Sequence, residues 1–128
     1  MGKEKLGSIE ISSLPGEKLS FPLTNAQITD ILNMSVSATY RWEYMDIIPP
    51  IPRKTSNGHK QFFPEHLIAS LRYLQKQRQK QNPDHPGHLW ITKIDLSDES
   101  LQQGGFIIET PTGYKIEFPG IQDNPTAS

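Results

Sequence analysis

The chain has 128 residues, of which 34% are hydrophobic, and this size suits one domain or one domain with a small appendage. It contains no cysteine, which excludes disulfides, thiolate metal sites and cysteine nucleophiles. The net charge of −1 hides an asymmetry: residues 24–82 carry eight Lys or Arg against four Asp or Glu (+4), whereas residues 83–128 carry two against seven (−5). A basic segment is typical of polyanion binders, and the acidic segment is expected to lie away from a polyanion.

The first 23 residues show only weak patterning. Alternation in SIEISS indicates one short strand at most, and Pro15 and Gly16 favour a turn. We therefore expect residues 1–23 to form a flexible arm. No apolar stretch follows the first charges, and no run approaches the roughly 20 apolar residues of a membrane span, so we expect a cytoplasmic protein without a membrane partner.

Two short amphipathic helices are predicted next. Apolar residues recur at helical spacing after Thr24, a good N-cap residue, and this helix is expected to end near Asn33. A second helix is expected to begin at Ser35 or Ser37, either of which can cap it. Its candidate core residues are Val36, Tyr40 and Met45. A link of two to four residues between such helices is typical of a helix-turn-helix.

A hairpin and a third helix follow. In IPRKTSNGHKQFF the pair Asn57-Gly58 lies between two extended arms and predicts a β-hairpin, which would be a wing. Pro64 is expected to open a helix that runs to about Gln81. Its buried face is predicted to consist of Leu67, Ile68, Leu71 and Leu74. Beyond Leu74 the helix reads QKQRQKQ, so it cannot continue a coiled-coil seam.

The last third of the chain is predicted to be rich in β-structure. LWITKIDL, residues 89–96, reads as a strand, and SDESLQQ reads as a short helix capped by Ser97 and stopped by Gly104. FIIETPTGYKIEF predicts a hairpin around a Pro-Thr-Gly turn. The expected fold class is α+β: a winged helix-turn-helix with its following helix over residues 24–82, then a small antiparallel β element over residues 83–128 that ends in a disordered tail.

Residues 24–63 resemble the amino-terminal domain of MerR-type transcription regulators. The family's Val-Ser-x-x-Thr-x-Arg-aromatic run corresponds to Val36, Ser37, Thr39, Arg41 and Trp42, although only one residue separates Ser37 from Thr39 here. Its Gly-Leu-Leu-Pro-Pro-like turn is matched by residues 46–50, and its wing signature by Arg53 and residues 57–62. The order and spacing of these three motifs are more specific for the MerR-type domain than any one motif alone. His59 and Lys60 replace the usual Tyr and Arg of the wing, which removes a bidentate contact to phosphate.

The resemblance and the geometry of recognition helices imply how DNA would be contacted. Short polar side chains at the start of such a helix reach base edges, while cations beside the wing turn neutralise phosphates. Arg41 is expected to clamp the backbone, with guanine readout left open, and Trp42 is either a backbone contact or a core residue. The DNA-binding candidates are Ser37, Ala38, Thr39, Arg41, Trp42, Arg53, Lys54, Asn57, His59 and Lys60.

The family's long dimerisation helix and its cysteine sensors are not found in this sequence. We therefore expect a homodimer formed through residues 89–118, with no cofactor and no metal. His85 and His88 lack a third ligand in view, and no pocket or partner accompanies the acidic residues, so no enzyme is expected.

The expected function is a sequence-specific regulator of transcription that binds double-stranded DNA, most simply a repressor at a pseudo-palindromic promoter site. Short, cysteine-free MerR-like repressors that accompany type V-K CRISPR-associated transposons look similar in build. Two alternatives stay open: an excisionase or recombination directionality factor that bends DNA, and a winged-helix module that binds proteins.

Overall fold

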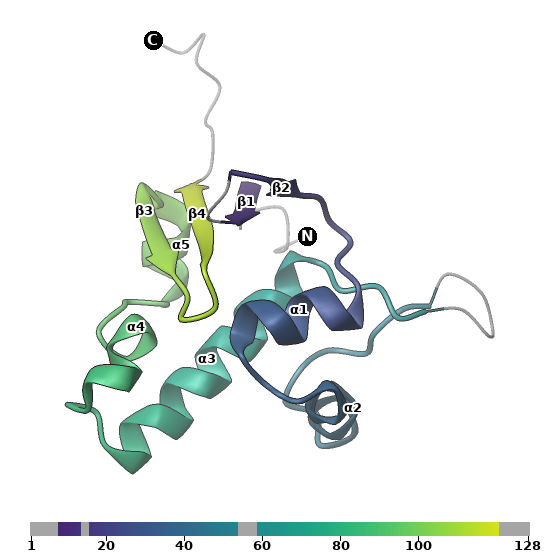
Figure 1. Ribbon diagram of the computed structural model, residues 1–128, viewed down its shortest axis with the longest axis horizontal. Helices are drawn as coiled ribbons and strands as arrows, with labels where there is room; N and C mark the ends of the chain where they lie inside the picture. Colours follow the sequence, from purple (N-terminus) through teal and green to yellow (C-terminus); the bar gives the residue numbers. More distant parts are fainter. Residues whose placement is uncertain (1–7, 14–15, 54–58, 121–128) are drawn as a thin grey trace, which may run out of the picture.

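Helices and one small sheet make up the computed structural model, which describes residues 8–13, 16–53 and 59–120 (Figure 1). This arrangement confirms the predicted α+β class. None of the described helices is both long and apolar enough to cross a membrane. The elements in chain order are β1 (Ser8–Ser13), β2 (Lys18–Leu19), α1 (Asn25–Leu32), α2 (Val36–Tyr44), α3 (Pro64–Gln81), the 3-10 turn η2 (Pro86–His88), α4 (Leu89–Thr92), α5 (Asp98–Gln103), β3 (Phe106–Glu109) and β4 (Tyr114–Gly120).

The sheet has the strand order β2-β1-β4-β3, with every neighbouring pair antiparallel. Ile11 of β1 lies opposite Leu19 on one side and opposite Ile116 of β4 on the other. The expectation of a flexible arm is therefore wrong for the described residues before α1. β1 is an inner strand whose Ile9 and Ile11 are buried, and its partner β4 lies about a hundred residues further along the chain, beyond the reach of local pattern.

The first two helices form as predicted. Thr24 caps α1 in a capping box: its hydroxyl accepts from the Gln27 N–H at 3.0 Å, and the Gln27 side chain accepts from the Thr24 N–H at 2.9 Å. Asn33 ends α1 in the left-handed region at φ 56°, and α2 begins after Ser35, its N-cap. The short turn between them packs α1 against α2, with Ile28 fully buried between these elements and the rest of the core.

The helix α3 runs through the middle of the molecule and supplies its core (Figure 1). Its apolar face is buried as predicted and consists of Leu67, Ile68, Leu71 and Leu74. Phe62, which is fully buried, precedes this helix and forms an isolated antiparallel bridge with Leu23. One continuous buried cluster joins side chains of the helices to those of β1, β3 and β4.

Residues 89–96 do not form the predicted strand. Leu89–Thr92 is the short helix α4, which lies beside the polar second half of α3. The Gln75 side chain donates to the carbonyls of Ile91 and Ile94, and the Gln79 side chain donates to the carbonyl of Thr92. A short apolar run cannot be assigned to strand or helix by periodicity, and here glutamine side chains satisfy the carbonyls that a sheet would otherwise pair.

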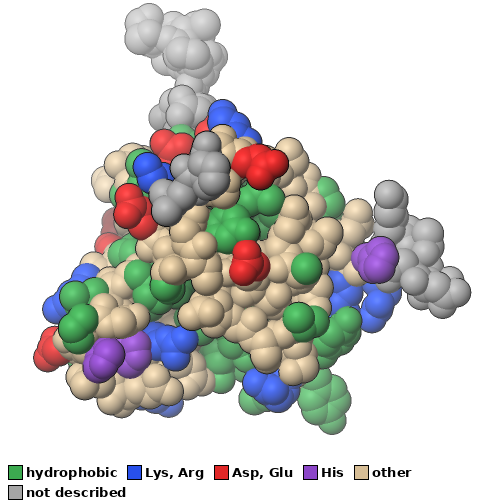
Figure 2. Space-filling view, in the orientation of Figure 1, with side chains coloured by type: hydrophobic (Ala, Val, Ile, Leu, Met, Phe, Trp, Pro, Cys, Tyr) green, Lys and Arg blue, Asp and Glu red, His purple; other side chains and the backbone are tan. Residues whose placement is uncertain are grey.

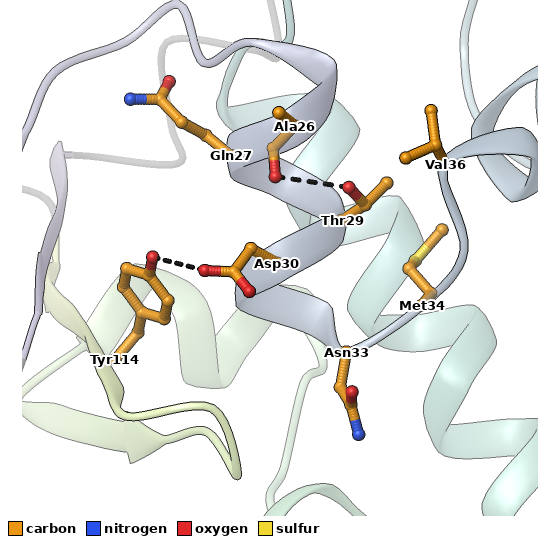
Figure 3. A pocket seen from close by; sticks show the side chains of 8 residues that line it. All are labelled: Ala26, Gln27, Thr29, Asp30, Asn33, Met34, Val36 and Tyr114. Atoms are coloured by element: carbon orange, nitrogen blue, oxygen red, sulfur yellow. Dashed lines mark hydrogen bonds between the residues drawn. The ribbon is translucent and has the colours of Figure 1, made fainter.

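The predicted hairpin β3–β4 is confirmed, and its turn rests on α1. Phe106 stacks on Phe118 across the two strands, with ring centroids 4.7 Å apart. At the other end of the hairpin, the Tyr114 hydroxyl donates to Asp30 Oδ2 at 2.6 Å (Figure 3), and the Thr112 hydroxyl donates to the carbonyl of Ile31 at 3.1 Å. These two contacts anchor the sheet to the first helix of the helix pair.

Candidate nucleic-acid interface

The inward face of α2 carries three of the ten predicted DNA-binding residues. Ala38, Thr39 and Trp42 are 4%, 1% and 7% exposed. The Thr39 hydroxyl donates to Asn25 Oδ1 at 2.8 Å, and the Trp42 ring meets the Tyr73 ring edge-on at 4.9 Å. The structure thus corrects the assignment of Ala38 and Thr39 as base-facing residues, and it favours the core role for Trp42.

The outward face of α2 carries residues of mixed chemistry. Ser37 and Arg41 are exposed, as a contact role requires. The prediction that Val36, Tyr40 and Met45 contact the core is wrong, because these side chains are 55%, 49% and 54% exposed. Once positions 38, 39 and 42 point inward, the helical period places positions 36, 37, 40, 41 and 44 on the opposite side. This face therefore offers one guanidinium, one small hydroxyl and two phenol rings.

Lys60, predicted to bind phosphate, is only 5% exposed. Its Nζ lies 2.9 Å from Glu43 Oε1 and 3.7 Å from the centroid of the Tyr40 ring. The other carboxylate oxygen of Glu43 accepts from the Ile51 N–H at 2.7 Å. We call Glu43, Lys60 and Tyr40 the Lys60 cluster.

The charge state of Glu43 follows from its contacts. Burial alone would raise the pKa of its carboxyl, but the hydrogen bonds from Ile51 and Lys60 and the charges of Lys60 and Arg53 hold that pKa below its usual value. The carboxylate is therefore ionised at neutral pH and forms a charge-assisted pair with the ammonium.

Arg53 and Lys60 lie opposite each other in an isolated antiparallel bridge, and the Gln61 N–H donates to the carbonyl of Pro52. We call these four residues the bridged segment. It lies where the sequence predicts the base of a hairpin. The predicted turn and the candidates Lys54 and Asn57 lie outside the described residues.

An open hollow of about 360 Å³ lies between the start of α1, α2 and the bridged segment. Its lining consists of Thr24, Asn25, Ala26, Tyr40, Arg53, His59 and Lys60. The first turn of α1 adds N–H groups that no intrahelical carbonyl can satisfy, together with the positive end of the helix dipole. Arg53 and His59 are both exposed at its rim. The hollow thus combines donors and positive charge, which suits an oxyanion such as a phosphate group.

A second open hollow lies where α2 crosses α3. It brings Arg41 close to Arg78 and Gln81, over a floor formed by Trp42 and Tyr73. Figure 2 shows Lys, Arg and His side chains on the right of the view and also at its lower left, with further Lys or Arg over the sheet, where most Asp and Glu seen from this direction lie. The acidic side chains on this face are thus concentrated over the sheet, while the basic ones are spread over several elements.

The two linker histidines lie together, with ring centroids 5.1 Å apart. The His85 ring accepts from the Gly87 N–H, and the His88 ring contacts the carbonyl of Asn82. Within the described part of the chain no group of three His, Asp or Glu side chains is placed to hold a metal ion. The structure gives these rings a role in shaping η2.

Sequence reasoning missed Tyr40, Glu43 and Asn25 as residues that shape the interface. Glu43 was recognisable only as an acidic residue eight positions before Ile51 and 17 before Lys60, a spacing that no local motif specifies. Asn25 lies 14 positions before Thr39 and donates from its amide to the carbonyl of Val36. These contacts depend on the packing of α1, α2 and the bridged segment.

Comparison of the chain with protein-family models, curated proteins and solved structures finds no match in any of the three. The function is therefore inferred from the chain's own residues and their arrangement.

Proposed function

We propose that the protein is a regulator that binds double-stranded DNA through a winged helix-turn-helix, with α2 as the recognition helix and the bridged segment as the base of the wing. The supporting observation is the exposed face of α2, with Ser37, Tyr40 and Arg41, beside a hollow rimmed by Arg53 and His59. An exposed helix next to a positively charged hollow is the arrangement that major-groove binding with flanking phosphate contacts requires.

The proposed contacts divide by chemistry. Ser37 and Tyr40 would reach base edges or sugars, and Arg41 would bind a guanine edge or a neighbouring phosphate. Arg53 and His59, with the first turn of α1, would hold one phosphate group in the hollow. The acidic outer residues of the sheet, Glu10 and Glu117, lie opposite each other across β1 and β4 and would be repelled by DNA.

We further propose that the protein acts as a homodimer on a pseudo-palindromic site and represses by occupancy. The sheet supports this proposal because β2 and β3 are edge strands, and β3 carries the exposed Ile107. Static light scattering of the full chain tests it. A molecular mass of two chains at the concentrations used for DNA binding is expected, and a mass of one chain would contradict the dimer.

DNA binding is tested by selection from a random duplex library, followed by fluorescence anisotropy with the best-enriched fragment. Arg41→Gln should raise Kd by about ten-fold, the loss expected for one good base or phosphate contact. Lys93→Gln is the matched control, because it removes one positive charge from α4, where the Lys93 side chain is 66% exposed. No enriched sequence, or equal affinities of the two variants, would contradict the proposal.

A protein-interaction module is the second candidate. The observation that favours it is the exposed apolar surface at the end of α2, where Tyr44 is 89% exposed and Met45 54% exposed. Tyr44→Ala separates the two readings. Loss of binding to a protein partner with unchanged DNA affinity would favour the module, whereas weaker DNA binding would place Tyr44 at the DNA interface.

A further inference from the structure

Three separate pieces of the chain meet at the carboxylate of Glu43. Glu43 itself lies near the end of α2, Ile51 lies just before the bridged segment, and Lys60 is part of that segment. The carboxylate binds the Ile51 N–H with one oxygen at 2.7 Å and the Lys60 ammonium with the other at 2.9 Å. One oxygen thus holds Ile51, just before the bridged segment, and the other holds Lys60, within that segment, against the recognition helix.

The ammonium of Lys60 is enclosed rather than offered to a ligand. Its side chain is 3% exposed, with the Glu43 carboxylate on one side and the Tyr40 ring 3.7 Å from the nitrogen. A cation between a carboxylate and an aromatic face has its charge largely compensated. Moving this ammonium to a phosphate would break both contacts and leave Glu43 facing the polyanion.

We propose that Lys60 and Glu43 are positioning residues that fix the wing to the recognition helix and orient the Tyr40 ring, and that Lys60 binds no phosphate. This inference rests on the proposed DNA-binding function. Glu43, although acidic, would then contribute to the binding of a polyanion. It does so only indirectly, because it positions the bridged segment and Lys60 and does not itself contact the DNA. The phosphate contacts of the wing then fall to Arg53 and His59, whose side chains are exposed.

The bridged segment and α2 therefore approach DNA as one unit. Tyr40, which precedes Arg41 on α2, is 49% exposed, and the Lys60 ammonium covers one face of its ring. Loss of the Lys60 side chain releases both the Tyr40 ring and the bridged segment. We therefore expect weaker DNA binding because the contacting groups are less well positioned, and not because an ammonium–phosphate pair is lost.

The test compares Lys60→Met, Glu43→Gln and the double variant in the full chain, with Kd measured over a series of KCl concentrations on the selected fragment. Each single variant should weaken binding by about ten-fold, and the double variant should be no weaker than the worse single variant, because both remove the same unit. The slope of log Kd against log salt should stay that of the wild type. Arg53→Gln is the comparator, and its slope should fall by about 0.9.

A slope that falls by about 0.9 in Lys60→Met would overturn the proposal, since it would show a phosphate contact. Unchanged affinity in Glu43→Gln would also overturn it. Circular dichroism checks folding, and if Lys60→Met fails to fold, Glu43→Gln carries the test, because the Glu43 side chain is 29% exposed and the change keeps its shape.

A measurement without DNA separates this inference from the proposed function. Hydrogen exchange of the Ile51 amide, followed by NMR, should be at least ten-fold faster in Glu43→Gln and Lys60→Met than in the wild type, because the acceptor is a neutral amide oxygen in Glu43→Gln and is no longer held by Lys60 in Lys60→Met. If the wild type binds no duplex and the exchange rates still change in this way, the proposed function fails while the positioning role stands. Unchanged exchange would refute the positioning role.

Discussion

Removal of the Tyr114 hydroxyl should loosen the sheet from the helix pair. Tyr114→Phe keeps the ring of β4 in place and deletes only the donor that reaches Asp30 Oδ2 at 2.6 Å. A hydrogen bond to an ionised acceptor contributes about 1.5–3 kcal/mol when buried, and the exposure of Asp30 reduces this to about 1 kcal/mol. For a chain of this size we expect Tm to fall by about 4 °C.

Chemical unfolding and calorimetry measure this loss. Tyr44→Phe is the control, because its ring is 89% exposed, and it should change the free energy of unfolding by less than about 0.5 kcal/mol. A double-mutant cycle with Asp30→Asn isolates the pair, and we expect a coupling of about 0.5–1 kcal/mol. A coupling of zero would refute the view that this hydrogen bond anchors the hairpin to α1.

The same contact has a pH signature. The hydrogen bond to Asp30, followed by burial and the negative charges of Asp30 and Glu17, raises the pKa of Tyr114 above its usual value of 10.0. A raised pKa in the folded state means that the stabilisation is complete below about pH 10 and is lost as pH rises through the folded-state pKa. The stability difference between wild type and Tyr114→Phe should therefore shrink only in strongly alkaline solution. A difference that already shrinks between pH 7 and 9 would contradict this assignment.

Three further outcomes are expected. The pKa of Glu43 lies below its usual 4.5, so the stabilisation from its ionised carboxylate is complete above that pH and is lost as pH falls through the folded-state pKa. The free energies of unfolding of wild type and Glu43→Gln should therefore converge in acid. A difference between them that stays constant with pH would contradict this. Phe62→Ala, at a fully buried site, should cost about 3–5 kcal/mol in denaturant unfolding, and a cost below about 1 kcal/mol would mean that this side chain is not core. Gly104→Ala should destabilise more than Gly105→Ala in the same assay, because both have positive φ but only a Cβ at Gly104 collides with the backbone of residues 119–120. Equal losses would contradict that packing.

The helices α1, α2, α3 and α5 were predictable because their signals are local. Thr24 and Ser97 cap helices with their hydroxyls where the sequence indicated, and Ser35 takes the N-cap position of α2 without a side-chain hydrogen bond. The apolar face of α3 follows a helical period over more than two turns. The strand predicted over residues 89–96 failed because the partners of that segment are glutamine side chains of α3, which pattern rules treat as solvated. The place of β1 in the sheet was not predicted, because its partner strand β4 is distant in sequence.

The helix that carries the candidate residues was predicted, but the direction of its side chains was not. A nine-residue helix has few positions on each face, so residue type alone decided that Tyr40 was core and Ala38 was not. The packing of Asn25 against Thr39 turns α2 the other way and leaves the phenol ring outside. The sequence predicted Lys60 to be a surface cation, because its acidic partner Glu43 lies 17 residues earlier and no motif links the two positions.

The inner position of β1 affects how the protein is made. This strand precedes all the helices, and its partner β4 follows all of them, so a ribosome releases β1 long before the strand it pairs with exists. During that interval the helix pair can already form from local contacts and β1 can pair with β2, but the N–H and C=O groups on the β4 side of β1 have no partner. Translation that stops before β4 would leave that side of β1 open to pairing with other chains, and the quality-control machinery of the cell would meet a product with a formed helix pair and an incomplete sheet.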